Sequence, residues 1–473
     1  MLLTNRTFDE INIGDSASLE RIVRADDLYV FAHVSGDQNP INMPGYDRNG
    51  DGTPDAVTPS MFVATLVSAV LGNILPGPGT LYRSQSCRFL ASGAIGERLT
   101  ARAEVTKKTA AGRLVTLRTT VTRPDGTLIM DGMAEVVAPA VRQTFDAAEL
   151  PQLLVETHDN SARLIQACSG LEPLSTAVVC AGEINALGGA LLGAERGLIR
   201  PILIGDPDKI AAAAKELGKD MANYELLPAA GPAEASDRAI ALVHEGRVAA
   251  IMKGHLHTDE LLRPIVRDTG PGGLRTARRL SHVFIMDVPS LRELLLVTDA
   301  AINIAPTLKE KVDITQNAID LALALGIAQP RVGVLSALEI VNPDVPSSLD
   351  AAALAKMAER GQITGGLVDG PLAMDNALSL AAARTKGITS LVAGRANILV
   401  VPNLESGNIL AKQLAFTAGA EGAGLVIGAR VPIMLTSRAD DEKSRLVSCA
   451  VAVLYESWRR TGSSAVKPVA SSE

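Results

Sequence analysis

The sequence predicts a multidomain protein in which a smaller α+β domain is followed by a larger, two-lobed α/β region. Three observations support this prediction. The chain has 473 residues, more than one ordinary domain holds. Its N-terminal third alternates apolar and polar residues as strands do, whereas the remainder alternates strand and helix patterns. Hydrophobic residues make up 47% of the chain and aromatic residues only 3%, so its cores depend on Ala, Leu, Val and Ile.

The N-terminal region contains three strand patterns and one apolar helix pattern. The strands are expected over residues 100–107, 113–122 and 127–138, and the helix over 60–75. The helix is apolar on nearly every side, which is typical of a helix wrapped by a sheet. One helix wrapped by an antiparallel sheet is a hot-dog fold. Because the strand periodicity is lost after residue 138, we predict that this domain covers residues 1–147.

Three segments of this domain resemble the MaoC-like enoyl-CoA hydratase family: 31–42 (FAHVSGDQNPIN), 75–82 (LPGPGTLY) and 87–90 (CRFL). That family adds water to trans-2-enoyl-CoA with an Asp/His pair. Asp37 matches the aspartate, but Asn42 stands where the histidine is expected. An asparagine side chain has no proton to exchange near neutral pH. The resemblance therefore implies a degenerate hydratase-like domain, with an active hydratase and a non-catalytic oligomerisation module as alternatives.

The loop over residues 47–55 is similar to a calcium-binding loop, since oxygen ligands alternate along it. The candidate ligands are Asp47, Asn49, Asp51 and Asp55. Position twelve of such a loop carries a bidentate glutamate, and here it is Thr58. The pattern favours a polar surface loop, and no metal is expected.

The remaining residues alternate strand and helix patterns, which predicts a mostly parallel, doubly wound sheet. Neither a Rossmann glycine motif nor a Walker A motif follows a strand, and residues 424–428 are only a glycine-spaced apolar run. Polar clusters follow several predicted strands, at 253–264, 298–307, 334–339, 368–377, 402–409 and 435–441. Ligands of open α/β sheets bind beyond the carboxyl ends of the strands, so these clusters predict an active site.

These clusters, within residues 165–460, resemble the phosphate acetyl/butyryltransferase family. The resemblance implies the reversible conversion of acyl-CoA and phosphate to acyl phosphate and CoA, with no permanently bound cofactor. It also implies a two-lobed phosphotransacetylase fold of the isocitrate/isopropylmalate dehydrogenase class, with the site in the cleft. The final segment then returns to the first lobe, which covers 148–290 plus 425–473, and the second lobe covers 291–424.

The resemblance also assigns roles to residues. Ser437 and Arg438 match the pair that assists the tetrahedral intermediate and binds phosphate, and Arg263 matches a second arginine of the family. Asp440 and Asp441 are candidate bases or caps of the helix that follows, since the family's aspartate position carries Ser444. Substrate-binding positions are expected at Asn403, Ser406, Asn408, Thr258 and Lys253. His255 and His257 are expected only to line the cleft.

Charge, hydropathy and cysteine spacing limit the partners and the cellular location that we expect for this chain. The net charge is −7 and no Lys/Arg-rich run is present, so nucleic acid is not expected. No apolar run is long enough to span a membrane, and the N-terminus lacks a signal core, which predicts a cytoplasmic protein. Four cysteines show no metal spacing. The expected partners are acyl-CoA, phosphate and acyl phosphate, together with further copies in a homo-oligomer of two or more chains. Acetyl is favoured as the acyl group, with butyryl and a bifunctional enzyme as alternatives.

Overall fold

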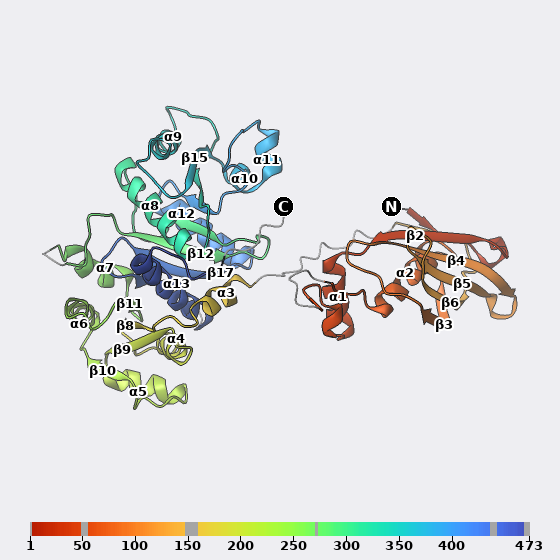
Figure 1. Cartoon of the computed structure of the whole chain (residues 1–473), viewed down its shortest axis with the longest axis horizontal. Helices are drawn as coiled ribbons and strands as arrows, with labels where there is room; N and C mark the ends of the chain where they lie inside the picture. Colours follow the sequence, from red (N-terminus) through yellow and green to blue (C-terminus); the bar gives the residue numbers. More distant parts are fainter. Residues whose placement is uncertain (1, 49–54, 147–158, 270–272, 436–441, 468–473) are drawn as a thin grey trace. The chain divides into compact units, whose positions relative to one another are not determined.

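The computed structural model of the protein describes residues 2–48, 55–146, 159–269, 273–435 and 442–467 (Figure 1). The chain divides into two compact units, Met1–Val155 and Glu156–Glu473. The predicted domain boundary at residue 148 lies outside the described residues. In the described ranges, every helix is too short or too polar to cross a membrane.

The N-terminal unit is built on a five-stranded antiparallel sheet in the order β2-β4-β5-β6-β3. Its strands are β2 (Ser16–Ile22), β3 (Leu81–Phe89), β4 (Arg98–Thr109), β5 (Leu114–Thr122) and β6 (Leu128–Val137). The three predicted strands are confirmed as β4, β5 and β6. A separate pair, β1 (Leu2–Thr4) and β7 (Thr144–Asp146), joins the ends of the unit.

Helix α2 (Ser60–Asn73) lies against this sheet, as the hot-dog prediction requires (Figure 1). It buries a stripe of apolar side chains, Phe62, Val63, Leu66, Val67, Val70 and Leu71. The expectation that all its sides are covered within the unit is wrong, because Met61 on another side is 60% exposed. Helix α1 (Ala25–Ser35) adds one edge-to-face contact, from Phe31 to Phe62, with ring centroids 6.0 Å apart. The sheet therefore covers one face of α2 rather than its whole circumference.

The C-terminal unit contains a sheet with the strand order β10-β9-β8-β11-β18-β17-β12-β13-β16-β14-β15. These strands are β8 (Leu174–Val179), β9 (Ile199–Gly205), β10 (Glu225–Pro228), β11 (Ala250–Lys253), β12 (Ser281–Asp287), β13 (Leu295–Thr298), β14 (Arg331–Leu335), β15 (Leu367–Leu372), β16 (Ile398–Val400), β17 (Glu421–Ile427) and β18 (Ile433–Met434). Most neighbours are parallel, as predicted, and only the pairings of β17 and the β12–β13 pair are antiparallel. The glycine-spaced run that ends at residue 428 overlaps the central strand β17.

Helices cover both faces of this sheet, so the doubly wound prediction is confirmed (Figure 1). One face carries α3 (Asn160–Ala167), α4 (Ile184–Glu195), α5 (Pro207–Glu216), α8 (Leu308–Ala324), α9 (Pro346–Glu359) and α13 (Glu442–Thr461). The other carries α6 (Pro232–His244), α7 (Thr258–Arg267), α10 (Met374–Leu378), α11 (Leu380–Thr385) and α12 (Leu404–Thr417). Apolar strand residues pack against both helical layers, as expected for strands buried on two sides.

Candidate active site

The predicted cluster at 253–264 begins at the last residue of β11, which lies between β8 and β18. The chain runs from β8 through β9 to the edge strand β10 and then returns through α6 to β11, on the other side of β8. The β8–β11 pair is therefore a topological switch point, the place where open α/β sheets bind ligands. Because β18 runs parallel to β11, residue 435 leaves the sheet at the same edge as residue 254. Ser437, Arg438, Asp440 and Asp441 lie outside the described residues.

The last residue of β11 and the residue that follows it are tightly packed. Lys253 is 4% exposed and its Nζ lies 3.5 Å from the carbonyl oxygen of Gly254. The amide of Gly254 donates to the carbonyl of Val179 at 2.8 Å, and a Cβ on Gly254 would collide with that strand end. The buried Arg445 of α13 donates to the carbonyl of Lys253 at 3.3 Å. Two buried cationic side chains therefore lie at the end of β11, and no pattern in the sequence indicates that Arg445 belongs there.

Helix α7 presents the other predicted residues of this cluster. His257, rather than Thr258 or Asp259, occupies the N-cap position, and its amide donates to Glu260 at 2.8 Å. Arg263 forms an exposed ion pair with Asp259 one turn earlier, at 2.9 Å. An exposed pair of this kind contributes only about 0.3–0.5 kcal/mol to a helix, so the guanidinium exchanges its partner at little cost.

A buried carboxylate organises the loop after β13. Asp299 is 2% exposed. Its oxygens accept from the amides of Ala301 at 2.9 Å, Ile302 at 3.0 Å and Asn303 at 3.3 Å, and from the side-chain amide of Asn303. The polar cluster at 298–307 was predicted, but no role was assigned to Asp299. The contacts make it the residue that shapes this loop.

The three predicted positions near α12 are placed beside this loop. Asn403 is the N-cap of α12, and its Oδ1 accepts from the amide of Ser406 at 2.9 Å. Ser406 Oγ donates to the carbonyl of Asn403, also at 2.9 Å. Asn408 Nδ2 donates to the carbonyl of Ala300 at 3.2 Å, which ties α12 to the Asp299 loop. The two capping side chains thus have a structural use, and substrate binding by these three residues stays a prediction.

Behind the loop lies a buried histidine. His282 of β12 is fully buried, its Nε2 is 3.4 Å from the carbonyl oxygen of Leu435, and burial lowers its pKa. Its Nδ1 has no partner among the described residues. A neutral ring is therefore favoured at this position.

The N-terminal unit does not assemble a water-activating pair in the residues described. Asp37 is exposed and its Oδ1 accepts from the amide of Asn39 at 3.1 Å. Asn42 is 7% exposed, and its Nδ2 donates to the carbonyl of Val57 at 2.8 Å. The amide that replaces the expected histidine is thus engaged by the backbone.

The calcium-like loop is only partly described. Asn49 and Asp51 lie outside the described residues. Asp55 Oδ1 accepts from the amide of Arg48 at 2.9 Å, and Oδ2 lies 3.5 Å from its Nε. Within the described ranges, which include Asp47, no group of three metal-ligating side chains is found.

Comparisons with known proteins give a consistent result for the C-terminal unit. The family described as phosphate acetyl/butaryl transferase matches residues 231–453. A phosphate acetyltransferase of Rhizobium meliloti is 54% identical over 298 residues, 63% of this chain and 94% of that protein. A phosphate butyryltransferase of Clostridium acetobutylicum is 42% identical over 260 residues, 55% of this chain and 86% of that protein.

Solved structures match each part of the chain. A branched-chain phosphotransacylase from Enterococcus faecalis has a TM-score of 0.52 and 29% identity, and the match covers 60% of this chain and 98% of that chain. An R-hydratase from Pseudomonas aeruginosa, PhaJ1, is 30% identical with a TM-score of 0.31, over 33% of this chain and 99% of that chain.

Proposed function

The chain belongs to the phosphate acetyl/butyryltransferase family, and we propose that it catalyses acetyl-CoA + phosphate = acetyl phosphate + CoA. The observation that carries this choice is the higher identity to the acetyltransferase of Rhizobium meliloti than to the butyryltransferase of Clostridium acetobutylicum. The test compares acetyl-, propionyl- and butyryl-CoA with phosphate in one assay. The highest kcat/KM is expected for acetyl-CoA. A clear preference for butyryl-CoA would replace acetyl by butyryl in this proposal.

Both substrates are proposed to bind together, with direct transfer between them. In the direction of acetyl-CoA formation, the CoA sulfur attacks the carbonyl carbon of acetyl phosphate, the new C–S bond forms, and the C–O bond to phosphate breaks. Asp440 or Asp441 takes the thiol proton, and the hydroxyl of Ser437 donates a hydrogen bond to the oxyanion. Arg438 and Arg263 hold the phosphate oxygens, since a guanidinium donates to such oxygens in pairs. Thr258 and Lys253 line the same site.

The role of Arg263 is tested by Arg263→Ala in the full chain. Loss of a charge-assisted contact to phosphate is expected to raise the KM for phosphate about tenfold or more. Asp259→Ala is the matched control, because it breaks the same ion pair but leaves the guanidinium. If both variants lost activity equally, the ion pair rather than the phosphate contact would explain the loss.

For the N-terminal unit we propose a degenerate hydratase-like domain, because the position of the expected histidine carries Asn42. Crotonyl-CoA hydration by the full chain tests this assignment. Turnover is expected to be negligible, and Asn42→His is expected to raise it if the remaining site is intact. Robust hydration by the wild-type chain would instead make the protein bifunctional.

We further propose a homo-oligomer of two or more chains. Strand β3 is an edge strand, and all of its residues except Cys87 are exposed in this unit. An uncovered edge strand of this length is a template for pairing with another strand. Light scattering of the full chain, compared with residues 150–473, tests whether the N-terminal unit enlarges the assembly. An unchanged assembly would remove the oligomerisation role.

Two finer proposals remain about the architecture and the cellular location. The lobes are proposed to cover 148–290 plus 425–473 and 291–424, with an isocitrate/isopropylmalate dehydrogenase-like arrangement around the cleft. Strand β18 beside β11 supports the return of the chain to the first lobe. A cytoplasmic location is proposed because acyl-CoA is the substrate, and cell fractionation tests it.

A further inference from the structure

One buried arginine connects two segments of the candidate active site. Arg445 is the fourth residue of α13 and is 1% exposed. Its Nη1 donates to the carbonyl oxygen of Lys253 at 3.3 Å, and Lys253 is the last residue of β11. The predicted site residues of α7, Thr258 and Arg263, follow this strand end in the sequence. The contact therefore joins α13 to the strand that leads into α7.

Helix α13 also fixes one end of the segment that carries the predicted serine–arginine pair. This segment begins after Leu435, whose amide donates at 3.1 Å to a carbonyl of the neighbouring strand β17. It ends at Glu442, the first residue of α13, and Ser437 and Arg438 lie between these two points in the sequence. Because Arg445 lies three residues after Glu442, on the same helix, it ties the end of this segment to the end of β11.

Helix α4 leaves room for Arg445 beside it. A Cβ on Gly189 would lie 2.6 Å from Cδ and 2.7 Å from Cβ of Arg445. A Cβ on the preceding residue, Gly188, would collide with the carboxylate of Glu442. Glycine in the interior of a helix is less favourable than alanine by about 1 kcal/mol. These two glycines allow α13 to approach α4 closely at the turn that carries Arg445.

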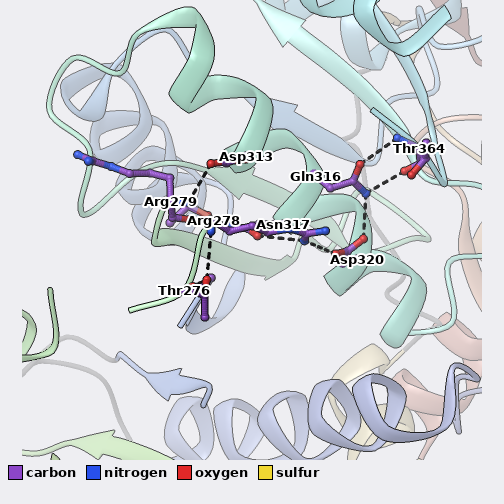
Figure 2. Close-up of polar contacts among 10 residues, drawn as sticks. Thr276, Arg278, Arg279, Asp313, Gln316, Asn317, Asp320 and Thr364 are labelled. Carbon is purple, nitrogen blue, oxygen red and sulfur yellow. Dashed lines mark hydrogen bonds and ion pairs between the residues drawn. The ribbon is translucent and has the colours of Figure 1, made fainter. Parts of the chain in front are cut away.

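The burial of Arg445 distinguishes it from an arginine of the segment after α7 (Figure 2). Arg278 in that segment runs toward Asp320 of α8 and pairs with it, and the side chain of Arg278 is 44% exposed. An exposed pair contributes only about 0–1 kcal/mol, so its members exchange with water at little cost. Arg445 is buried and packed against α4, and a buried charge keeps its hydrogen bonds because losing them is costly. Arg445 therefore holds one fixed geometry.

The end of β11 is also held by the strand beside it. The amides of Gly254 and His255 donate, at 2.8 and 3.0 Å, to the carbonyls at the end of β8 and of the residue that follows it. These two hydrogen bonds set the strand end relative to β8. The hydrogen bond from Arg445 adds the link to α13.

We propose that Arg445 is a positioning residue for acyl transfer. It fixes α7, with Arg263, relative to the segment that carries Ser437 and Arg438, and it contacts neither substrate. Reacting groups must lie about 3–3.5 Å apart in an aligned geometry, and a misplacement of about 1 Å lowers the rate about 100-fold. Arg445 therefore acts on the rate of transfer more than on substrate affinity. This inference rests on the proposed acyl-CoA reaction.

The variant Gly189→Ala, in the full chain, tests this role without removing the charge. The added methyl group displaces Arg445, so kcat is expected to fall about tenfold or more, while the KM values for CoA and phosphate change less than about threefold. Arg445→Met removes the guanidinium and should lower kcat at least as far, and Arg445→Lys should restore part of it. The matched control is Gly193→Ala, one turn along α4, where a Cβ would meet Cys449 of α13 at 3.1 Å and Ile199 at 3.2 Å. Its kcat should match that of the wild type.

Hydrogen exchange measures the same displacement without turnover. The amides of Gly254 and His255 should exchange faster in Gly189→Ala and in Arg445→Met than in the wild type and in Gly193→Ala. All measurements are made well below the unfolding midpoint of each variant, so that unfolded protein does not explain a loss of activity.

Equal kcat values for Gly189→Ala and Gly193→Ala would overturn the inference, and so would unchanged exchange at Gly254. A higher KM with an unchanged kcat would assign Arg445 to substrate binding instead and would also overturn it. A wild type that transferred no acyl group would refute the proposed reaction, and the exchange rates would still decide whether Arg445 fixes the end of β11.

Discussion

Removing the carboxylate of Asp299 should destabilise the C-terminal unit by a predictable amount. In Asp299→Ala, the amides of Ala301, Ile302 and Asn303 lose their acceptor inside the protein. A buried donor without a partner costs about 1–3 kcal/mol, and the contact at 3.3 Å is the weakest of the three. We therefore expect the free energy of unfolding to fall by about 3–5 kcal/mol.

The free energy of unfolding of Asp299→Asn should lie between that of Asp299→Ala and that of the wild type. Its remaining oxygen keeps the acceptor for Ala301 and Ile302, and only the contacts to Asn303 are lost. A loss of about 1–2 kcal/mol is expected for this substitution. The graded order distinguishes hydrogen bonding from a simple effect of side-chain volume, since Asn is nearly isosteric with Asp.

The chain provides its own probe for this measurement. Its one tryptophan, Trp458, lies in α13 and packs against the main core of the C-terminal unit. Urea unfolding followed by tryptophan fluorescence therefore reports on that unit alone, and the midpoint should shift at constant slope. Asp208→Ala, at an exposed position of α5, is the control and should stay within about 0.5 kcal/mol of the wild type. If Asp299→Ala cost no more than this control, the carboxylate would not hold the loop.

Three further predictions use the same tryptophan signal. Burial lowers the pKa of His282, so the unfolded chain binds a proton at this residue before the folded chain does as the pH falls. The free energy of unfolding should therefore decrease below about pH 6.5, by up to about 1.4 kcal/mol per pH unit. His282→Gln should reduce this pH dependence, measured as urea midpoints at several pH values. Gly424→Ala would place a Cβ 2.8 Å from His282 Nε2 and closer still to the carbonyl of Leu435, and should lower the free energy of unfolding by about 1–3 kcal/mol; an unchanged midpoint would refute this steric reason. Asp350→Ala removes the carboxylate that lies 2.7 Å from Nζ of Lys311, a residue that is 5% exposed, and should lower the free energy of unfolding by about 2–4 kcal/mol. Lys311→Met should lower it less, because it leaves no buried charge unpaired. A larger loss for Lys311→Met than for Asp350→Ala would contradict this reasoning.

The secondary structure was predictable where burial leaves a pattern in the sequence. Strands β4, β5 and β6 alternate buried and exposed residues, and the sequence predicts each of them within a few residues. Strand β3 was missed as a strand, because an edge strand exposed on both faces shows no alternation. Strand β17 was missed because its glycines made it look like a glycine-spaced apolar run. Gly424 is needed there because His282 and the carbonyl of Leu435 fill the space that a side chain would occupy.

The candidate site was predictable as a set of segments and not as a set of contacts. A polar residue after a strand can cap a helix or bind a ligand, and the pattern is the same in both cases. Asn403 and Ser406 act as caps in the structure, while Asn408 reaches the carbonyl of Ala300, 108 residues earlier in the chain. The buried Arg445 lies in an apolar helix pattern, and only its tertiary contact with Lys253 indicates that it belongs to the site.

The position of the Asp299 loop has a consequence for how substitutions combine. The loop is fixed internally by its own carboxylate. It contacts α12 through Asn408, and it contacts the segment after α7 through Arg279, whose Nε donates to Asn303 Oδ1 at 2.7 Å. A substitution that loosens the loop should therefore weaken both contacts together. Asp299→Asn and Asn408→Ala both act on this loop, so their effects on the free energy of unfolding should be less than additive. Strict additivity of the two losses, measured by urea unfolding, would mean that Asn408 holds the carbonyl of Ala300 independently of the Asp299 carboxylate.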